Sequence, residues 1–324
     1  MFPRLPFLDF VFRIEEVNYL TKILSSIYEN QIWSDDKFDD YLKTKQIRDN
    51  PSSASIIIQT WCDNYCSFCI VPYTRWQEIS RPMDDIIEET KQAVKSWAKE
   101  ITLLGQNVNS YGKQFNKKLW NEEKSKWNNF EWKSPFWILL DELGKIEWLD
   151  RIRFTSSNPH DMTNDILEIH FTNKGICNYL HFALQSWSDE MLKRMNRKHS
   201  YQDFKKMVDY LRWKDPYFSI STDIIVGYSW ETDEMFQETC NAMEELEFDF
   251  VFIARYSVRK WTIASKIYPD DVPDLVKSER WHILNNILKK NVEKRHNAMV
   301  WRVEEILVWW EKEGDFYGRT RNFK

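Results

Sequence analysis

The sequence predicts an α/β protein in which six β-strands alternate with six α-helices. Short runs of β-branched residues recur from residue 54 onward, and each run is followed by a segment with helix-like character. Six successive strand–helix units predict a parallel sheet, which is either doubly wound or curled into an open barrel. The predicted strands are Ser55–Thr60, Glu100–Leu104, Arg151–Thr155, Tyr179–Leu184, Ser219–Val226 and Phe248–Arg255.

The segment Pro82–Lys99 illustrates why the stretches between the strands are predicted to be helices. A proline suits the first helical turn, and Asp84 and Asp85 favour the positive end of the helix dipole. Apolar side chains from Ile86 to Trp97 recur near one face at helical spacing. The other predicted helices are Pro135–Ile146, Met162–Thr172, Tyr201–Arg212, Glu231–Glu245 and Asp274–Met299.

Three stretches fall outside this alternation. Residues 112–134 are polar and charged, which predicts an exposed insertion after the second strand, and residues 34–53 are typical of a linker. The apolar N-terminus carries Arg4 and Asp9 and lacks a small-residue cleavage site, so it does not resemble a signal peptide. In parallel α/β folds ligands bind at the carboxyl ends of the strands, so functional residues are expected directly after them.

Composition excludes several classes of protein. The net charge of -5 and the pI of about 5.8 argue against a generally basic nucleic-acid binder, although a local basic patch is compatible with them. No run of about 18 apolar residues is present, so no membrane-spanning helix is expected. Five cysteines in 324 residues do not suggest a disulfide scaffold. A reducing cytoplasm is therefore the expected location.

Three of the cysteines are crowded into one motif directly after the first predicted strand. Cys62, Cys66 and Cys69 form the sequence C-D-N-Y-C-S-F-C. Three thiolates at this spacing can hold three irons of a [4Fe–4S] cluster and leave the fourth iron open for a substrate. A zinc site or a redox thiol pair is the alternative, but zinc usually takes four ligands and the next histidine is His160. Cys177 and Cys240 stand alone and are predicted to be structural.

The motif C-x-x-x-C-x-aromatic-C after the first strand resembles the signature of the radical S-adenosylmethionine (SAM) family. The resemblance implies a partial (β/α)6 barrel in which SAM chelates the open iron of the cluster. Phe68 matches the position that packs near the adenine of SAM, although an ordinary core role is the alternative. Within that family, the segments 69–82 (CIVPYTRWQEISRP) and 103–112 (LLGQNVNSYG) resemble the methylthiotransferases, and G-Q-N-V-N resembles the MiaB group. The likeness continues in the segments 151–163, 184–201, 221–232 and 256–265.

This resemblance implies an activity, cofactors and partners. The implied reaction is 2-methylthiolation of N6-isopentenyladenosine beside the tRNA anticodon, in which a 5′-deoxyadenosyl radical abstracts hydrogen from adenine C2. It implies two [4Fe–4S] clusters and SAM as cofactors, tRNA as substrate, an external electron donor, no membrane and a monomer. Other methylthiotransferase substrates, a ribosomal-protein Asp or threonylcarbamoyl-adenosine, are the first alternative. An inactive cluster-binding fragment is the second.

Polar residues and glycines directly after three strands are the candidate SAM contacts. Ordinary strand-end turns and hydrogen bonds are the alternative explanation for each of them. Arg75 and Arg81 are further candidates, either for phosphate contact or for surface salt bridges. The candidate SAM contacts, besides Phe68, are Gly105, Gln106, Asn107, Gln185, Ser186, Asp223 and Gly227.

The expected domain organisation also follows from the resemblance. Residues 1–47 resemble the tail of an N-terminal methylthiotransferase domain with its linker, 48–299 the radical SAM core, and 300–324 the opening of a tRNA-binding TRAM β-barrel. The family's N-terminal domain holds the auxiliary cluster on three cysteines, and no cysteine precedes Cys62. A chain truncated at both ends is therefore expected to bind SAM but not to complete sulfur insertion alone.

Tryptophan and glycine occur in abnormal numbers. The chain has 17 Trp and 7 Gly, whereas average usage would give about 23 glycines. Trp281, in a predicted helix, is expected to be a genuine tryptophan. We interpret the tryptophans that stand at glycine-type positions as UGA codons that have been translated as Trp, although the lineage of this gene uses UGA for Gly. Tryptophans stand where the family pattern has glycine at Trp61, Trp76, Trp187, Trp230 and Trp261, and the same is expected of Trp148, Trp301 and one of Trp309 or Trp310.

Overall fold

The computed structural model describes residues 51–74, 77–113 and 133–324. These described residues all belong to one compact unit. The proposed N-terminal tail 1–47, Trp76, Arg75 and most of the 112–134 insertion lie outside the described residues. The strands are β1 Ser53–Ile57, β2 Gln59–Thr60, β3 Ile79–Ser80, β4 Glu100–Leu104, β5 Arg151–Phe154, β6 Tyr179–His181, β7 Ser219–Val226, β8 Phe250–Arg255, β9 Ile306–Lys312 and β10 Asp315–Thr320. The α-helices are α2 Val71–Thr74, α3 Met83–Lys95, α5 Pro135–Leu143, α6 Asn164–Thr172, α7 Asp189–Arg194, α8 Tyr201–Lys214, α9 Asp233–Leu246, α10 Ile263–Ile267 and α11 Asp274–Asn297.

Two three-stranded parallel sheets organise these elements, in the orders β1-β4-β5 and β6-β7-β8. Isolated parallel bridges join Ile152 to Ile176 and Ser157 to Phe182, beside β5 and β6. All six predicted strands are present, and two of them, β4 and β7, have the predicted bounds. The first predicted strand is divided, because Gln59 and Thr60 turn away to pair antiparallel with β3. The sheets therefore place the ends of all six strands along one edge.

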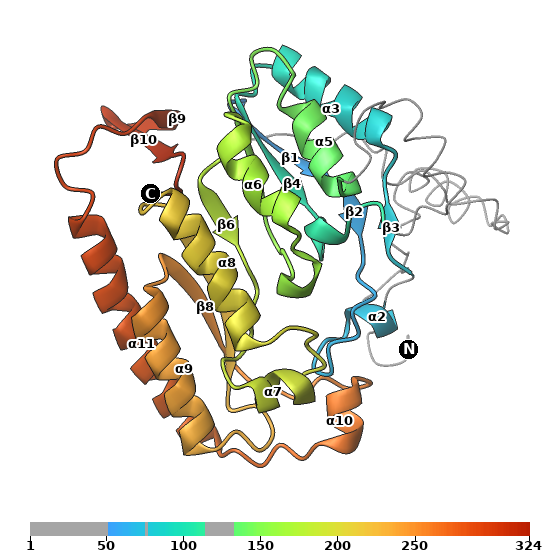
Figure 1. Cartoon of the computed structure of the whole chain (residues 1–324), viewed down its shortest axis with the longest axis vertical. Helices are drawn as coiled ribbons and strands as arrows, with labels where there is room; N and C mark the ends of the chain where they lie inside the picture. The colour runs from blue at the N-terminus through green and yellow to red at the C-terminus, as the bar shows by residue number, and fades with distance from the viewer. Residues whose placement is uncertain (1–50, 75–76, 114–132) are drawn as a thin grey trace, which may run out of the picture. The chain divides into compact units, whose positions relative to one another are not determined.

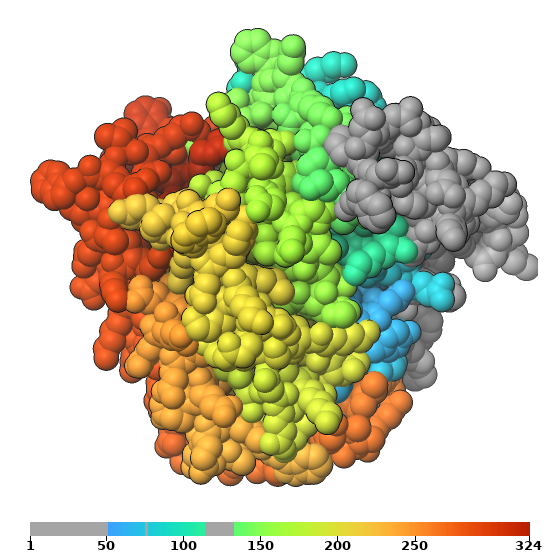
Figure 2. All heavy atoms as spheres, viewed as in Figure 1, coloured from blue at the N-terminus to red at the C-terminus, as the bar shows by residue number. Residues whose placement is uncertain are grey.

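The helices cover one face of the sheets (Figure 1). Alternate strand residues on that face are almost fully buried in a single hydrophobic core, as Ile56, Leu103, Ile152, Leu180 and Ile224 show. In the space-filling view, side chains of α8 and α9 close over this face (Figure 2). Because strand side chains alternate, the residues between these core positions point to the opposite face, which is free to carry polar groups.

The helix α3 ends four residues earlier than predicted. Its last residue is Lys95, and Trp97 lies beyond the C-cap with a φ of 75° and an exposed side chain. A left-handed residue after the C-cap is the usual way for a helix to stop, and glycine is the residue that adopts it without strain. Trp97 was predicted to continue the apolar face, and that prediction was wrong because the backbone has already left the helix.

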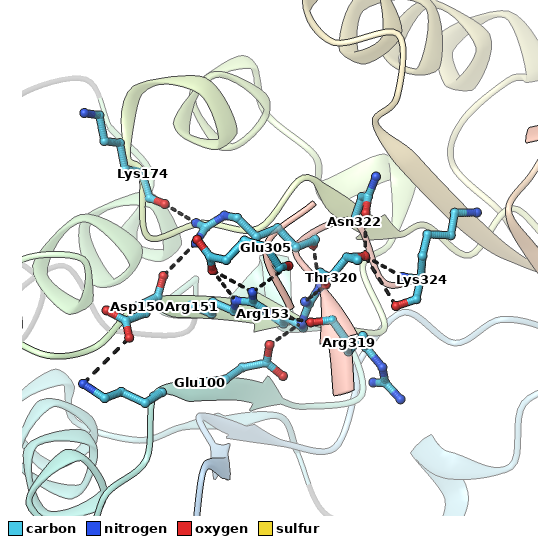
Figure 3. Close-up of polar contacts among 12 residues, drawn as sticks. Glu100, Asp150, Arg151, Arg153, Lys174, Glu305, Arg319, Thr320, Asn322 and Lys324 are labelled. Carbon is cyan, nitrogen blue, oxygen red and sulfur yellow. Dashed lines mark hydrogen bonds and ion pairs between the residues drawn. The ribbon is translucent and has the colours of Figure 1, made fainter. Parts of the chain in front are cut away.

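The C-terminal hairpin of β9 and β10 is attached to the amino end of β5 (Figure 3). Arg153 pairs with Glu100 at 2.9 Å and donates through Nη2 to the carbonyl of Thr320 at 2.7 Å. Arg151 is nearly fully buried and pairs with Glu305 at 2.7 Å. Among the described helices, none is long and apolar enough to cross a membrane.

A buried histidine in α6 makes the stability of this fold depend on pH. His170 lies between the rings of Phe154 and Phe218, and its Nδ1 lies 2.9 Å from the carbonyl oxygen of Cys177. Burial lowers the pKa of His170 to about 4. An unfolded chain binds this proton near pH 6.5, so unfolding is favoured as the pH falls from about 6.5 to 4.

We expect this group to remove roughly 1.4 kcal/mol of stability for each pH unit across that window, or about 3 kcal/mol in total. The measurement is urea unfolding of the unaltered chain and of His170→Gln at pH 7, 5.5 and 4.5. On unfolding, the unaltered chain should take up about one more proton than the variant. Its unfolding free energy should therefore fall more steeply as the pH decreases. Equal slopes for the two proteins would contradict this assignment.

Candidate functional site

The cysteine motif lies on the loop that follows β2, and contacts from distant segments hold this loop in place. The backbone N–H of Ser67 donates to Met195 at the end of α7, and the carbonyl of Ser67 accepts from Ala264 of α10 at 2.8 Å. The hydroxyl of Ser67 also bonds to the hydroxyl of Tyr228 at 2.7 Å. Asn196 donates to the carbonyl of Tyr65 at 2.8 Å. The loop is therefore fixed by backbone and side-chain groups that come from beyond β6 and β7.

Hydrogen-bond donors surround the thiols themselves. Arg197 Nη1 lies 3.4 Å from Cys66 Sγ, and Asn64 Nδ2 lies 3.3 Å from Cys62 Sγ. Cys66 is buried, and Cys62 and Cys69 are half-buried. Burial raises the pKa of Cys62 to about 11 and raises that of Cys69. Without a metal these thiols stay protonated at neutral pH, so thiolate formation requires metal binding to supply the free energy.

Within the described residues, no three His, Cys, Asp or Glu side chains are grouped as the ligands of one metal ion. The cluster assignment for Cys62, Cys66 and Cys69 stays a prediction from the motif.

The polar residues after β4 fix the cysteine loop and the neighbouring strand ends. The side-chain oxygen of Gln106 accepts a hydrogen bond from the backbone N–H of Trp61, next to Cys62. Asn107 is buried and donates to Asp161 at 2.6 Å. A Cβ on Gly105 would come within 3.3 Å of the Gln59 carbonyl oxygen, so glycine permits the close approach of β2. These three predicted residues lie beside the loop, where they have structural partners.

Asp223, within β7, and Gln185, after β6, lie together. Asp223 Oδ1 is 3.3 Å from His181 Nε2, and burial raises the pKa of Asp223 to about 6 against the lowering effects of Arg197 and Gln185. Gln185 has a φ of 82°, and its backbone N–H donates to the Asp223 carbonyl at 2.8 Å. Burial also lowers the pKa of His181 to about 4. At neutral pH this histidine is therefore uncharged beside a carboxylate.

The remaining predicted contacts have local packing roles. Phe68 is half-buried and meets Tyr228 edge-on, with ring centroids 6.4 Å apart. Gly227 has a φ of 69°, donates its N–H to Glu231 at 2.6 Å, and leaves no space for a Cβ beside Lys277. Ser186 is buried. Nothing in these positions tests contact with SAM, so that role stays a prediction for all of them.

Sequence reasoning missed several residues that build the site. Arg197 lies inside the quoted segment 184–201, yet only the fold brings it to Cys66. Asn109, the last residue of G-Q-N-V-N, exchanges two hydrogen bonds with the backbone of Asn158, at 2.8 and 2.9 Å. Burial, with the charges of Asp63 and Asp161, raises the pKa of Glu78 to about 7, although a hydrogen bond from Ser110 opposes the shift. The candidate phosphate contact Arg81 is instead buried and paired with Glu89 at 2.7 Å.

The site is thus that of an α/β enzyme whose three cysteines share one loop at the ends of parallel strands. Residues 56–243 match the radical SAM superfamily. The structure of the coproporphyrinogen III oxidase HemN from Escherichia coli, a radical SAM enzyme, superposes with a TM-score of 0.51 and 18% identity. That match covers 75% of this chain and 53% of the other, and it supports the same fold.

Named relatives narrow the assignment of the chain within the radical SAM superfamily. The tRNA-2-methylthio-N(6)-dimethylallyladenosine synthase of Protochlamydia amoebophila is 37% identical over 330 residues, covering 100% of this chain and 67% of the relative. Those of Clostridium botulinum and Methylacidiphilum infernorum are 34% and 42% identical, over 99% and 83% of this chain. The chain belongs to this family of radical SAM methylthiotransferases. It spans 69% and 56% of the latter two relatives.

Enzymes of this family use a [4Fe–4S] cluster and SAM as cofactors, and the residues around the cysteine loop of this chain fit both. Cys62, Cys66 and Cys69 would supply three thiolate ligands, which would leave the fourth iron open. Arg197 and Asn64 donate to sulfur, as hydrogen bonds around iron–sulfur sites commonly do. Beside them, Asp223 and Gln185 offer polar groups at strand ends, where ligands of parallel sheets bind.

Proposed function

We propose that this chain is the catalytic part of an enzyme that adds a methylthio group to N6-dimethylallyladenosine in tRNA. The alignment of the whole chain with relatives named for this reaction carries the proposal. The cysteine loop and the G-Q-N-V-N segment, which lie against each other through Gln106 and Trp61, support it. The alternative substrates of related methylthiotransferases have no comparable support among these relatives.

The proposed architecture is a partial (β/α)6 barrel over residues 48–299, with 300–324 opening a TRAM β-barrel and 1–47 ending an N-terminal methylthiotransferase domain. The order β1-β4-β5 and β6-β7-β8, with bridges between β5 and β6, supports the barrel. The β9–β10 hairpin supports the start of a β-domain. In this proposal the enzyme is a cytoplasmic monomer with an external electron donor, and a second, auxiliary [4Fe–4S] cluster belongs to the N-terminal domain.

In this mechanism the residues of the protein bind and orient the cofactors. When bound, the cluster supplies the electron that cleaves SAM. Cys62, Cys66 and Cys69 would hold it, and Arg197 would stabilise the negative charge on sulfur through its hydrogen bond to Cys66. Gln106 keeps the backbone before Cys62 in place. Asp223 and His181 present a polar pair toward the face of the sheets that the helices leave free.

We expect a polypeptide of these 324 residues to cleave SAM reductively without forming methylthiolated tRNA. The cysteine loop is present, but the sequence has no cysteine before Cys62 to hold the auxiliary cluster, which carries the transferred sulfur in this family. The test is anaerobic reconstitution, followed by incubation with SAM, dithionite, sulfide and isopentenylated tRNA. 5′-Deoxyadenosine should form, and nucleoside analysis should find no 2-methylthio product.

The complete gene product is the matched control in that assay. It should form both 5′-deoxyadenosine and the 2-methylthio nucleoside. Absence of the modified nucleoside with the complete product, on a cluster-loaded protein that cleaves SAM, would contradict the proposed function. Methylthiolation by the 324 residues alone would contradict the role of the auxiliary cluster.

A further inference from the structure

The face of β6, β7 and β8 opposite the core lines a large cavity, together with α11 and the C-terminal residues 322–324. Core residues such as Leu180, Ile224 and Val251 point to the helices, so the alternate residues of these strands point away from them. The cavity has a volume of about 1240 Å³, which exceeds the roughly 300–1,000 Å³ of ordinary small-molecule sites. Its strand-borne lining includes Tyr179, His181, Ser219, Phe250 and Phe252.

This cavity connects with the cysteine loop through a series of polar side chains. Arg197 contacts Cys66 Sγ at 3.4 Å, and its charge acts on Asp223. Asp223 in turn lies 3.3 Å from His181, which lines the cavity. A ligand in the cavity would therefore lie next to the groups that we assign to the cofactors.

Two phenylalanines leave much of their surface open on this face. Phe252 is 54% exposed and Phe250 is 45% exposed. Their ring centroids lie 4.5 Å apart with an interplanar angle of 80°, and Phe252 lies 5.9 Å from the ring of His181. Phe252 is also the direct strand partner of Asp223. Adjacent exposed rings in a cavity mark a binding surface for a planar or apolar ligand.

We propose that Phe252 and Phe250 form the platform that binds the substrate base, with Phe252 stacking on the purine and Phe250 contacting its apolar N6 substituent. This inference rests on the proposed function and adds the subsite for the base to it. A nucleobase stacked on an aromatic side chain gains roughly 1–3 kcal/mol. The five-carbon dimethylallyl group has no polar atoms, so an apolar ring is the partner that favours it over an unmodified adenine.

The test compares two anticodon stem–loop RNAs, one with N6-dimethylallyladenosine and one with adenosine at the same position. Both are titrated into the complete gene product and into its Phe252→Ala, Phe252→Tyr and Phe250→Ala variants. Phe252→Ala should weaken binding of the prenylated RNA by about tenfold or more, since stacking of roughly 1–3 kcal/mol is removed. Phe252→Tyr should restore most of it. Phe250→Ala should reduce the preference for the prenylated RNA.

Trp213→Ala is the matched control, because Trp213 is an exposed aromatic residue on α8, on the helical side of the sheets. It should leave both affinities and the formation of 5′-deoxyadenosine without RNA unchanged. If Phe252→Ala binds both RNAs as the unaltered protein does, the platform is overturned, while product formation by the unaltered protein would still support the function. An equal loss of affinity in Trp213→Ala would also overturn it.

Discussion

Replacing Cys66 with serine is expected to abolish reductive cleavage of SAM in the reconstituted protein. Removing even an outer-shell partner of a metal ligand typically costs 10–100-fold, so loss of the ligand itself should lower 5′-deoxyadenosine formation by more than about 100-fold. The unaltered chain should bind about four irons with the chromophore of a [4Fe–4S] cluster. Cys66→Ser should lose most of the iron, because Cys66 is the buried thiol of the three.

Cys240→Ala provides the control for that measurement. Cys240 is buried in the core on α9, away from the cysteine loop in sequence, and its role is packing. This variant should keep the iron content and the SAM cleavage of the unaltered chain. One zinc per chain without an iron chromophore would contradict the cluster assignment, as would full activity in Cys66→Ser.

The alternation of strands and helices could be predicted from the sequence because it depends on local patterns. β4 and β7 have the predicted bounds. The antiparallel pairing of β2 with β3 was not predictable in this way. It joins Gln59 to Ser80 across an intervening loop, and a strand of two residues is too short to show a periodicity that would predict it.

The site was predictable only as far as its motifs extend. The cysteine spacing indicates a cluster because three ligands lie within eight residues. Arg197 is more than 100 residues away from Cys66, and its contact depends on how α7 packs against the loop. The same holds for Asp161, which bonds to Asn107 only after β4 and β5 have paired. Contacts of this kind follow from tertiary structure, not from spacing along the chain.

The backbone geometry of several tryptophans supports the interpretation that they are recoded glycines. Trp61, Trp230 and Trp261 have φ values of 65°, 61° and 73°, in the left-handed region. Such values cost a non-glycine residue about 1–2 kcal/mol. Trp187 differs, because it is buried without a positive φ, and its indole N–H has no partner among the described residues. Trp309 and Trp310 lie within β9 and have no left-handed backbone either.

Three further tryptophans share the left-handed geometry. They are Trp148 and Trp301, as expected, and Trp97, which the sequence pattern had assigned to a helix face. Trp97 and Trp148 also bound a surface cavity of about 860 Å³ between α3 and the end of α5. This cavity exists because of the two indoles, so it carries no evidence for a ligand. Trp281 is unlike all of these, since it is half-buried in α11 and donates to the Ile253 carbonyl at 2.9 Å.

We therefore expect Trp→Gly substitutions to have opposite effects at the two kinds of position. Combined replacement of Trp97, Trp148, Trp261 and Trp301 should stabilise the chain by roughly 2–4 kcal/mol, because each site gains about 1–2 kcal/mol from relief of left-handed strain and loses about 0.5–1 kcal/mol to the greater backbone freedom of unfolded glycine. Trp281→Gly should destabilise it by about 2–4 kcal/mol, since the packing of a half-buried indole is lost and glycine costs roughly 1 kcal/mol within a helix. Urea unfolding of the three proteins measures both effects. Destabilisation by the combined replacement would show that these indoles stabilise the fold.

The gene supplies an independent measurement of the same hypothesis. We expect UGA codons at Trp61, Trp76, Trp187, Trp230 and Trp261, and UGG at Trp281. Glycine in the native chain would remove a bulky side chain from the residue before Cys62, where the backbone N–H bonds to Gln106, and from the turn between β7 and α9. Peptide mass spectrometry of the protein from its natural source should then find glycine at the UGA positions. UGG at all five would refute recoding and leave a protein whose cofactor loop is strained by genuine tryptophans.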